Sequence, residues 1–310
     1  MYLNFFGLTE NPFNVTPDPK FLYMRSRHLE ALDQLQYGAH ERGGFIVLTG
    51  NAGTGKTTLL QALRQRLDED TAVSYVFNPT LPFDDIVEYL LEDLGIAKPE
   101  ESPAGRLAAL NNFLAEREQA GQKTILIIDE AHHLDAATLE QISQLSSREN
   151  GPGKLLQVLL VGQPELATRL DRRELRHVKN RISLRCHVSP LDSGETHEYI
   201  RGRLNVAGAP DLALFSDRAI KRIARHSGGI PRLINVLADH CLLFGYVDQK
   251  RRIDRSIVDQ AIAYLEETLR SPRMVLSRDD AGFLRRFGWI LGVVGVGLAS
   301  AVAGFLLGAF

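Results

Sequence analysis

A glycine-rich segment that ends in lysine and threonine carries the clearest chemistry of the sequence. It reads GNAGTGKTT from residue 50 to residue 58 and fits the pattern G-x-x-x-x-G-K-[ST]. Glycines let such a loop wrap closely around phosphate, and its backbone N–H groups act as donors. Lys56 would reach the β- and γ-phosphates of a nucleotide, and the Thr57 hydroxyl would bind Mg²⁺. We therefore expect an ATP-binding loop made of Gly50, Asn51, Ala52, Gly53, Thr54, Gly55, Lys56, Thr57 and Thr58.

Two adjacent carboxylates, Asp129 and Glu130, follow the apolar run ILII. A buried strand would leave Asp129 at its carboxyl end, which is where ligands of open α/β sheets bind. Asp129 would hold Mg²⁺ together with Thr57, and Glu130 would polarise an attacking water. Downstream of a phosphate-binding loop, this pair predicts hydrolysis of ATP with Mg²⁺ rather than nucleotide binding alone.

Three polar residues outside these two motifs are further catalytic candidates. Gln163 directly follows the apolar run LLQVLLVG. There it would sense the γ-phosphate or orient the water, or would be a plain turn residue before Pro164. Arg181 lies in a basic stretch, residues 171–185, that we expect to be helical. It would complete a neighbouring subunit's site as an arginine finger, or the stretch is a solvated helix face. Arg232 would touch the γ-phosphate from the first turn of a lid helix, or lie on the surface.

Residues 129–132 also spell Asp-Glu-Ala-His, as in one class of helicases. Those enzymes need a second sheet domain, and the expected strands provide only one, so we discount a helicase. The pair His132 and His133 has no carboxylate or cysteine partner at metal-ligand spacing. We therefore expect it to be a polar helix start near the nucleotide.

Apolar runs that would form strands alternate with amphipathic segments over the first 190 residues. The expected strands cover residues 44–50, 72–78, 124–130 and 155–162, with a last one beginning near residue 184. Apolar strands separated by helices indicate a parallel sheet covered on both faces. Four more segments indicate a small helical domain with Ser193 and Ser216 as helix N-caps, and they cover residues 193–208, 216–229, 230–247 and 255–270.

The composition, with 44% hydrophobic and 24% charged residues, is typical of a globular protein. The formal net charge of −2 provides no overall basic surface for nucleic acid. Cys186 and Cys241 have no metal-type spacing, so we expect buried free thiols in a reducing compartment. The N-terminus has neither a basic start nor a long apolar core, and we expect no signal peptide.

The segment from residue 287 to residue 310 contains no charged residue. As a helix it would be about 36 Å long, enough to cross a bilayer core of ~30 Å. An excess of arginine marks the side of a membrane helix that stays in the cytoplasm. Five arginines precede the segment, and only two aspartates lie nearby. The arginines are Arg270, Arg273, Arg278, Arg285 and Arg286. We therefore expect a single-pass helix in the inner membrane, with the nucleotide-binding part in the cytoplasm.

Together these motifs resemble the AAA+ family, in the branch of general secretion pathway protein A and related exopolysaccharide or PEP-CTERM locus ATPases. The resemblance extends from about residue 2 to residue 270. The segment FFGLTENPFNVTPDPKFLY is similar to that branch's N-terminal signature. LLVGQPEL is similar to its sensor 1 region, and GGIPRLINVL to its sensor 2 helix. The resemblance implies an adenine-pocket role for Phe5, Leu8, Pro12 and Phe13, which otherwise would form a hydrophobic staple on the sheet domain. Relatives typically continue past a membrane helix into a periplasmic peptidoglycan-binding domain.

These observations predict an α/β fold, a P-loop NTPase parallel sheet of the AAA+ type with a C-terminal helical lid and a C-terminal transmembrane helix. The expected parts are an adenine-pocket segment (1–24), the ATPase domain (25–190), the lid (191–270), a juxtamembrane linker (271–286) and the membrane helix (287–310).

The favoured function is a homo-oligomeric, membrane-tethered ATPase that assembles or regulates a secretion, pilus or exopolysaccharide export machine. One alternative is a nucleic-acid-associated ATPase of the transposition-helper type, which shares the GQPEL-type signature and would use basic residues 172–185. The other is a nucleotide-gated switch with negligible turnover. The apolar tail and the near-neutral charge argue against the first alternative, and Glu130 argues against the second.

Overall fold

The computed structural model describes residues 2–16, 19–21, 27–40, 44–77, 80–97, 102–146 and 156–270. The chain divides into two compact units, Met1–Ile262 and Ala263–Phe310. The expected linker and membrane helix, residues 271–310, lie outside the described residues. Among the helices that are described, none combines the length and apolar character needed to span a bilayer.

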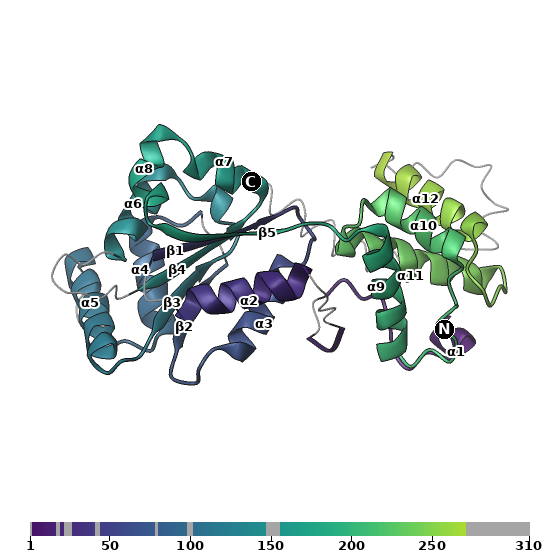
Figure 1. Cartoon of the computed structure of the whole chain (residues 1–310), viewed down its shortest axis with the longest axis horizontal. Coiled ribbons are helices and arrows are strands. Elements are labelled where there is room, and N and C mark those ends of the chain that lie inside the picture. The colour runs from purple at the N-terminus through teal and green to yellow at the C-terminus, as the bar shows by residue number, and fades with distance from the viewer. Residues whose placement is uncertain are drawn as a thin grey trace. The chain divides into compact units, whose positions relative to one another are not determined.

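Five strands form one fully parallel sheet in the order β2-β3-β4-β1-β5 (Figure 1). They are β1 Gly44–Gly50, β2 Ala72–Val76, β3 Thr124–Ile128, β4 Gln157–Gly162 and β5 Ile182–Val188. This confirms the parallel α/β sheet expected from the apolar runs. Because all strands run the same way, the segments after β1, β3 and β4 leave the sheet at the same edge. These three strands are adjacent, so the phosphate-binding loop, Asp129 and Gln163 are brought together.

Helices cover both faces of the sheet, because successive strand residues point to opposite sides. Ile46 and Leu48 of β1 pack with α2 (Arg27–His40) and α3 (Lys56–Arg66) in one core cluster. Phe45 and Val47 belong to the second cluster, on the other face. That cluster also takes side chains from α4 (Phe83–Asp93), α5 (Pro103–Gln119), α6 (Ala136–Leu145), α7 (Pro164–Leu170) and α8 (Arg176–Lys179). The sheet is therefore buried on both faces, and it supports the loops that follow β1, β3 and β4.

The segment after β5 is helical, as expected, and contains α9 Ser193–Val206, α10 Asp217–Ser227, α11 Pro231–Val247 and α12 Arg255–Arg270. Ser216 caps α10 by accepting a hydrogen bond from the Ala219 N–H. Ser193 is not the cap of α9, which corrects the prediction. Asp192 holds that position and forms a capping box with Glu195, whose side chain accepts from the Asp192 N–H in return. The helix begins at Asp192 because this pair satisfies two backbone N–H groups, and Ser193 is consequently inside the helix.

The N-terminal residues pack against the helical region. A short helix, α1 Tyr2–Phe6, brings the Phe5 ring to 5.5 Å from the Tyr246 ring on α11. The buried Phe13 ring lies 5.8 Å from the Phe215 ring. These contacts correct the alternative that Phe5 and Phe13 form a staple on the sheet domain. The apolar residues are held by the helices that follow the sheet in sequence.

The basic stretch of residues 171–185 is not one helix, which corrects a second prediction. It contains a 3₁₀ turn, η3 Arg173–Leu175, then the four-residue α8, and residues from Ile182 onward form β5. Ile182, Leu184 and Cys186 alternate with polar residues, which is the period of a strand and not of a helix. Arg181 therefore lies in the connection between α8 and β5.

Candidate nucleotide site

The phosphate-binding loop joins β1 to α3, the connection that the sequence predicts. Gly53 and Gly55 have φ values of 79° and 98°, a left-handed backbone that favours glycine. The Thr54 hydroxyl donates to the Asn51 carbonyl at 2.8 Å and closes the loop on itself. Lys56 starts α3, so the N-terminal N–H groups of an 11-residue helix point toward the loop. The arrangement can hold an anion through backbone donors.

Lys56 extends across the loop rather than into solvent. Its Nζ donates to the Gly50 carbonyl at 2.9 Å and to the Asn51 carbonyl at 3.2 Å, and the side chain is buried. Burial lowers the pKa of the Lys56 ammonium, while the nearby carboxylates of Glu130 and Asp129 oppose that shift. The ammonium is thus anchored beside both the loop and the acidic pair.

Asp129 lies at the centre of the site and is buried. Its Oδ2 accepts hydrogen bonds from Thr57 Oγ1 at 3.3 Å and from the Tyr75 hydroxyl at 2.8 Å. A hydroxyl and a carboxylate oxygen this close together match the oxygen ligands that Mg²⁺ prefers. The structure therefore brings together Thr57 and Asp129, the two residues expected to hold the metal.

Tyr75 is a site residue that the sequence analysis missed. It lies on β2 and pairs with Ile127 of β3, two residues before Asp129. Burial, followed by the Asp129 charge, raises the pKa of the Tyr75 hydroxyl, so that it remains a donor. Its contact depends on the register between β2 and β3, which no local pattern reveals.

Glu130 leaves β3 in a left-handed conformation, with φ 52°, which is uncommon for a residue with a side chain. Burial, together with the Asp129 charge, raises the pKa of its carboxyl group, and Lys56 acts in the opposite direction. Its Oε2 is buried without a hydrogen-bond partner among the described residues. His132 Nδ1 is 3.3 Å away, an ion-pair distance outside hydrogen-bond geometry. Glu130 is therefore a carboxylate held weakly beside the proposed metal ligands.

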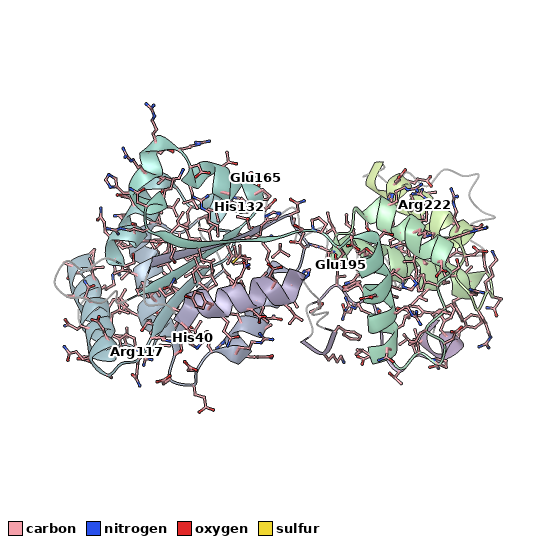
Figure 2. The ribbon with its side chains drawn as sticks, viewed as in Figure 1. His40, Arg117, His132, Glu165, Glu195 and Arg222 are labelled. Carbon is pink, nitrogen blue, oxygen red and sulfur yellow. The ribbon has the colours of Figure 1, made fainter. Side chains whose placement is uncertain are left out.

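Gln163 lies where β4 ends, as expected, and begins α7 as its N-cap residue. Its side chain does not cap the helix. Instead, Gln163 Nε2 lies 3.3 Å from His132 Nε2, at the sheet edge where Figure 2 labels His132 and Glu165. The contact joins the ends of β3 and β4 through their side chains.

The start of α11 meets the phosphate-binding loop directly. The Arg232 backbone N–H donates to the Gly53 carbonyl at 3.2 Å. A Cβ on Gly53 would lie 2.7 Å from the Cβ of Arg232. Both this close approach and the positive φ of Gly53 therefore require glycine. The Arg232 side chain is exposed. The expected position of Arg232 beside the loop is thus present in the structure, and its role remains a prediction.

His28 is a second residue that the sequence analysis missed. It lies in the first turn of α2, and its Nε2 is 3.1 Å from the Thr54 carbonyl. The loop is consequently supported from α2 on one side and from α11 on the other.

Comparison with known proteins agrees with this geometry. A family model described as an AAA domain matches residues 39–170. General secretion pathway protein A of Aeromonas hydrophila is 40% identical over 256 residues, which is 82% of this chain and 46% of that protein. The chain belongs to the AAA+ family. It is similar to general secretion pathway protein A and spans about half the length of this curated relative.

Solved AAA+ neighbours show the same fold at low identity. The ORC2 protein of Aeropyrum pernix, determined as ADPNP-ADP complexes, superimposes with a TM-score of 0.61 at 18% identity, covering 83% of this chain and 72% of that one. The Cdc6p protein of Pyrobaculum aerophilum gives a TM-score of 0.62 at 19% identity, covering 83% and 74%. At these identities the likeness concerns the fold alone.

Within this AAA+ fold, Arg181 lies far from the loop of its own chain. Its carbonyl accepts the Phe45 N–H at the start of β1, whereas the loop follows the end of β1. Six residues of strand span roughly 20 Å. Its guanidinium donates to the carbonyl of Ser143 on α6 and, at 2.9 Å, to Ser143 Oγ. Arg181 therefore lies too far away to contact the phosphate-binding loop of its own chain.

Two carboxylates, Asp171 and Glu174, offset part of the positive charge between residues 172 and 185. Asp171 pairs with Lys179 at 2.8 Å and with Arg185 at 3.2 Å. The hydrogen bond from Lys179 and the Arg185 charge lower the pKa of the Asp171 carboxyl. Arg172 lies 3.9 Å from Glu174. The six Lys and Arg residues of this stretch still outnumber these two carboxylates. A nucleic-acid-binding function is not favoured, because the 40% identical relative is general secretion pathway protein A.

Proposed function

We propose that this chain hydrolyses ATP with Mg²⁺ and uses the reaction to assemble or regulate a secretion, pilus or exopolysaccharide export machine. The observation that carries the proposal is the contact of the Thr57 hydroxyl with Asp129, with Lys56 and Glu130 beside it. Its test is phosphate release from ATP by the purified protein with Mg²⁺, and this activity should be lost in Glu130→Gln protein.

Each residue of this chain has one task in the proposed reaction. The backbone N–H groups of the loop and Lys56 bind the phosphates, and Thr57 and Asp129 hold the metal. Bound Mg²⁺ would neutralise charge on the β- and γ-phosphates. Glu130 orients the water and accepts its proton, Gln163 contacts the γ-phosphate, and Arg232 closes the helical lid over the nucleotide. The family resemblance assigns Phe5, Leu8, Pro12 and Phe13 to the adenine side of the pocket, although Phe5 and Phe13 pack on Tyr246 and Phe215 in this structure.

The assignment to a secretion or export machine is supported by the likeness to general secretion pathway protein A. The AAA domain matched at residues 39–170 contains the phosphate-binding loop and both carboxylates, and this is the proposed motor. We infer a homo-oligomer because Arg181 cannot serve the site of its own chain.

The trans role of Arg181 predicts a rescue by mixing. Arg181→Ala protein should bind ATP normally and hydrolyse it poorly, since an arginine finger contributes about 10³–10⁵-fold to turnover in other nucleotide hydrolases. Mixing it with Glu130→Gln protein should recover part of the phosphate release, because one kind of mixed interface joins an intact Glu130 to an intact Arg181.

Two controls separate this role from support of α6. Ser143→Ala removes the hydroxyl that Arg181 contacts and keeps the bond to the Ser143 carbonyl. It should leave turnover within about twofold, and a loss as large as that of Arg181→Ala would indicate that the arginine acts by supporting α6. Arg185→Ala tests the loss of a neighbouring charge. If cross-linked mixed oligomers form and no ratio restores activity, Arg181 is not the finger.

The uncharged segment of residues 287–310 supports a further part of the proposal, a single-pass anchor in the inner membrane with the ATPase in the cytoplasm. Deleting it should move the protein from the membrane pellet to the supernatant after ultracentrifugation. Replacing Gly304 and Gly308 with leucine keeps the segment apolar, and this variant should remain in the pellet. A deletion variant that still sediments with membranes would refute the anchor.

A further inference from the structure

Asp129 is held by groups from several elements around the end of β3. Its backbone N–H donates to the Val76 carbonyl of β2 at 3.0 Å, and its Oδ1 accepts the Glu130 N–H at 2.9 Å. Its Oδ2 accepts the hydroxyls of Thr57 at 3.3 Å and of Tyr75 at 2.8 Å. The edge strand β2 therefore holds Asp129 twice, through the main chain at Val76 and through the Tyr75 side chain.

Hydrogen-bond chemistry fixes the direction of both hydroxyl contacts. An ionised carboxylate can only accept, so Tyr75 and Thr57 both donate to Asp129. The Tyr75 bond has the usual O–H···O length and the Thr57 bond is longer, so Tyr75 is the closer restraint on Oδ2. Because a hydroxyl has one hydrogen, a Thr57 that donates to Asp129 keeps its oxygen lone pairs for a metal. The orientation of Thr57 thus depends on where the Asp129 carboxylate is held.

Tyr75 is itself fixed at three points. Its backbone N–H donates to Asp93 Oδ2, at the end of α4, at 3.1 Å. Its side chain packs against the core cluster that contains Leu59 and Leu60 of α3, the helix that also carries Thr57. The Phe77 ring lies against the Tyr75 ring, with centroids 4.1 Å apart. A tyrosine held in this way can define the position of the carboxylate that its hydroxyl contacts.

We propose that Tyr75 is a positioning residue for the metal ligands Thr57 and Asp129. A carboxylate has about four acceptor directions, and Tyr75, Thr57 and the Glu130 N–H fill three of those of Asp129. The Tyr75 hydroxyl holds the carboxylate so that the remaining direction is kept for the metal or its bound water. Without that hydroxyl the carboxylate can rotate, and both ligands lose their alignment. The inference rests on the proposed ATP hydrolysis with Mg²⁺ and adds a residue of β2 that sets the metal affinity.

Tyr75→Phe tests this role in the full-length protein, because it removes only the hydroxyl and keeps the ring. With a non-hydrolysable ATP analogue bound, the affinity for Mn²⁺, a paramagnetic substitute for Mg²⁺, should fall about 10- to 100-fold. This is the usual cost of removing a group that hydrogen-bonds a metal ligand. Electron paramagnetic resonance of free Mn²⁺ measures the affinity, with protein in excess over the analogue. Affinity for the analogue in EDTA should stay within about twofold of wild type, because Tyr75 acts through the metal ligands.

The Mg²⁺ dependence of phosphate release gives a second readout. The Mg²⁺ concentration for half-maximal release should rise by a similar factor in Tyr75→Phe protein, whereas kcat at saturating Mg²⁺ should stay within about threefold of wild type. A tyrosine that only stabilised the fold would leave the Mg²⁺ dependence unchanged. Tyr89→Phe removes a hydroxyl from α4 and is the matched control, which should behave as wild type in both assays. Circular dichroism shows whether Tyr75→Phe is folded, and Tyr75→Leu replaces it in both assays if it is not.

The inference is overturned if the folded variant binds Mn²⁺ within about twofold of wild type, or if saturating Mg²⁺ does not restore its phosphate release. A Glu130→Gln protein with wild-type turnover would instead refute the proposed function, whereas Mn²⁺ affinity is measured without any turnover. The two failures are therefore distinguishable.

Discussion

Glu130→Gln protein should bind ATP with wild-type affinity and lose about 10²- to 10⁴-fold of its turnover, the usual contribution of a general base. The substitution preserves size and shape and removes the group that accepts the proton. Glu130 is half-exposed beside the buried Asp129, and burial raises the pKa of its carboxyl group, which suits proton acceptance. Phosphate release and fluorescent-ATP titration measure the two quantities separately.

Glu116→Gln, an exposed carboxylate on α5, is the matched control and should not alter either quantity. Equal turnover of wild type and Glu130→Gln would show that another group activates the water. Loss of affinity instead of turnover would mean that Glu130 helps to hold the metal or the nucleotide.

Lys56→Ala should weaken ATP binding about 10- to 100-fold or more, the worth of one or two charge-assisted hydrogen bonds. Lys56 is the positively charged side chain of the loop that would contact the phosphates. Its Nζ also donates to the carbonyls of Gly50 and Asn51. The fold should survive, because α3 keeps its apolar contacts with the sheet. Titration with fluorescent ATP, with circular dichroism as the check on folding, measures the effect.

Arg64→Ala removes a positive charge from the exposed side of the same helix and should leave affinity unchanged. If folded Lys56→Ala protein retained wild-type affinity, the nucleotide would have to bind somewhere other than this loop.

The features predicted from the sequence are those that depend on short segments. The apolar run of β1, its glycine turn and Lys56 occupy consecutive residues, so their geometry follows from local chemistry. Asp129 after β3 and Gln163 after β4 follow from the same rule about parallel strands. Gly228 adopts a left-handed conformation at the end of α10, and Pro231 begins α11, as their residue types favour.

The contacts that could not be predicted join segments distant in sequence. Tyr75 reaches Asp129 because of strand register, and His28 reaches the loop because of where α2 begins. Basic composition favoured a helix over residues 171–185, but alternating apolar residues and pairing with β1 make its second half a strand. Ser193 was the expected cap of α9, but Asp192 holds that position because Glu195 returns its hydrogen bond.

The most direct test of the proposed ATP hydrolysis is single-turnover phosphate release. It uses purified full-length protein in excess over ATP, with and without Mg²⁺. If Thr57, Asp129 and Glu130 form one hydrolytic site, wild-type protein should release phosphate only with Mg²⁺, and Glu130→Gln protein should keep the nucleotide bound and intact. Equal release by Glu130→Gln protein would contradict the proposed site, and so would no release by folded wild-type protein that has bound all of the ATP with Mg²⁺.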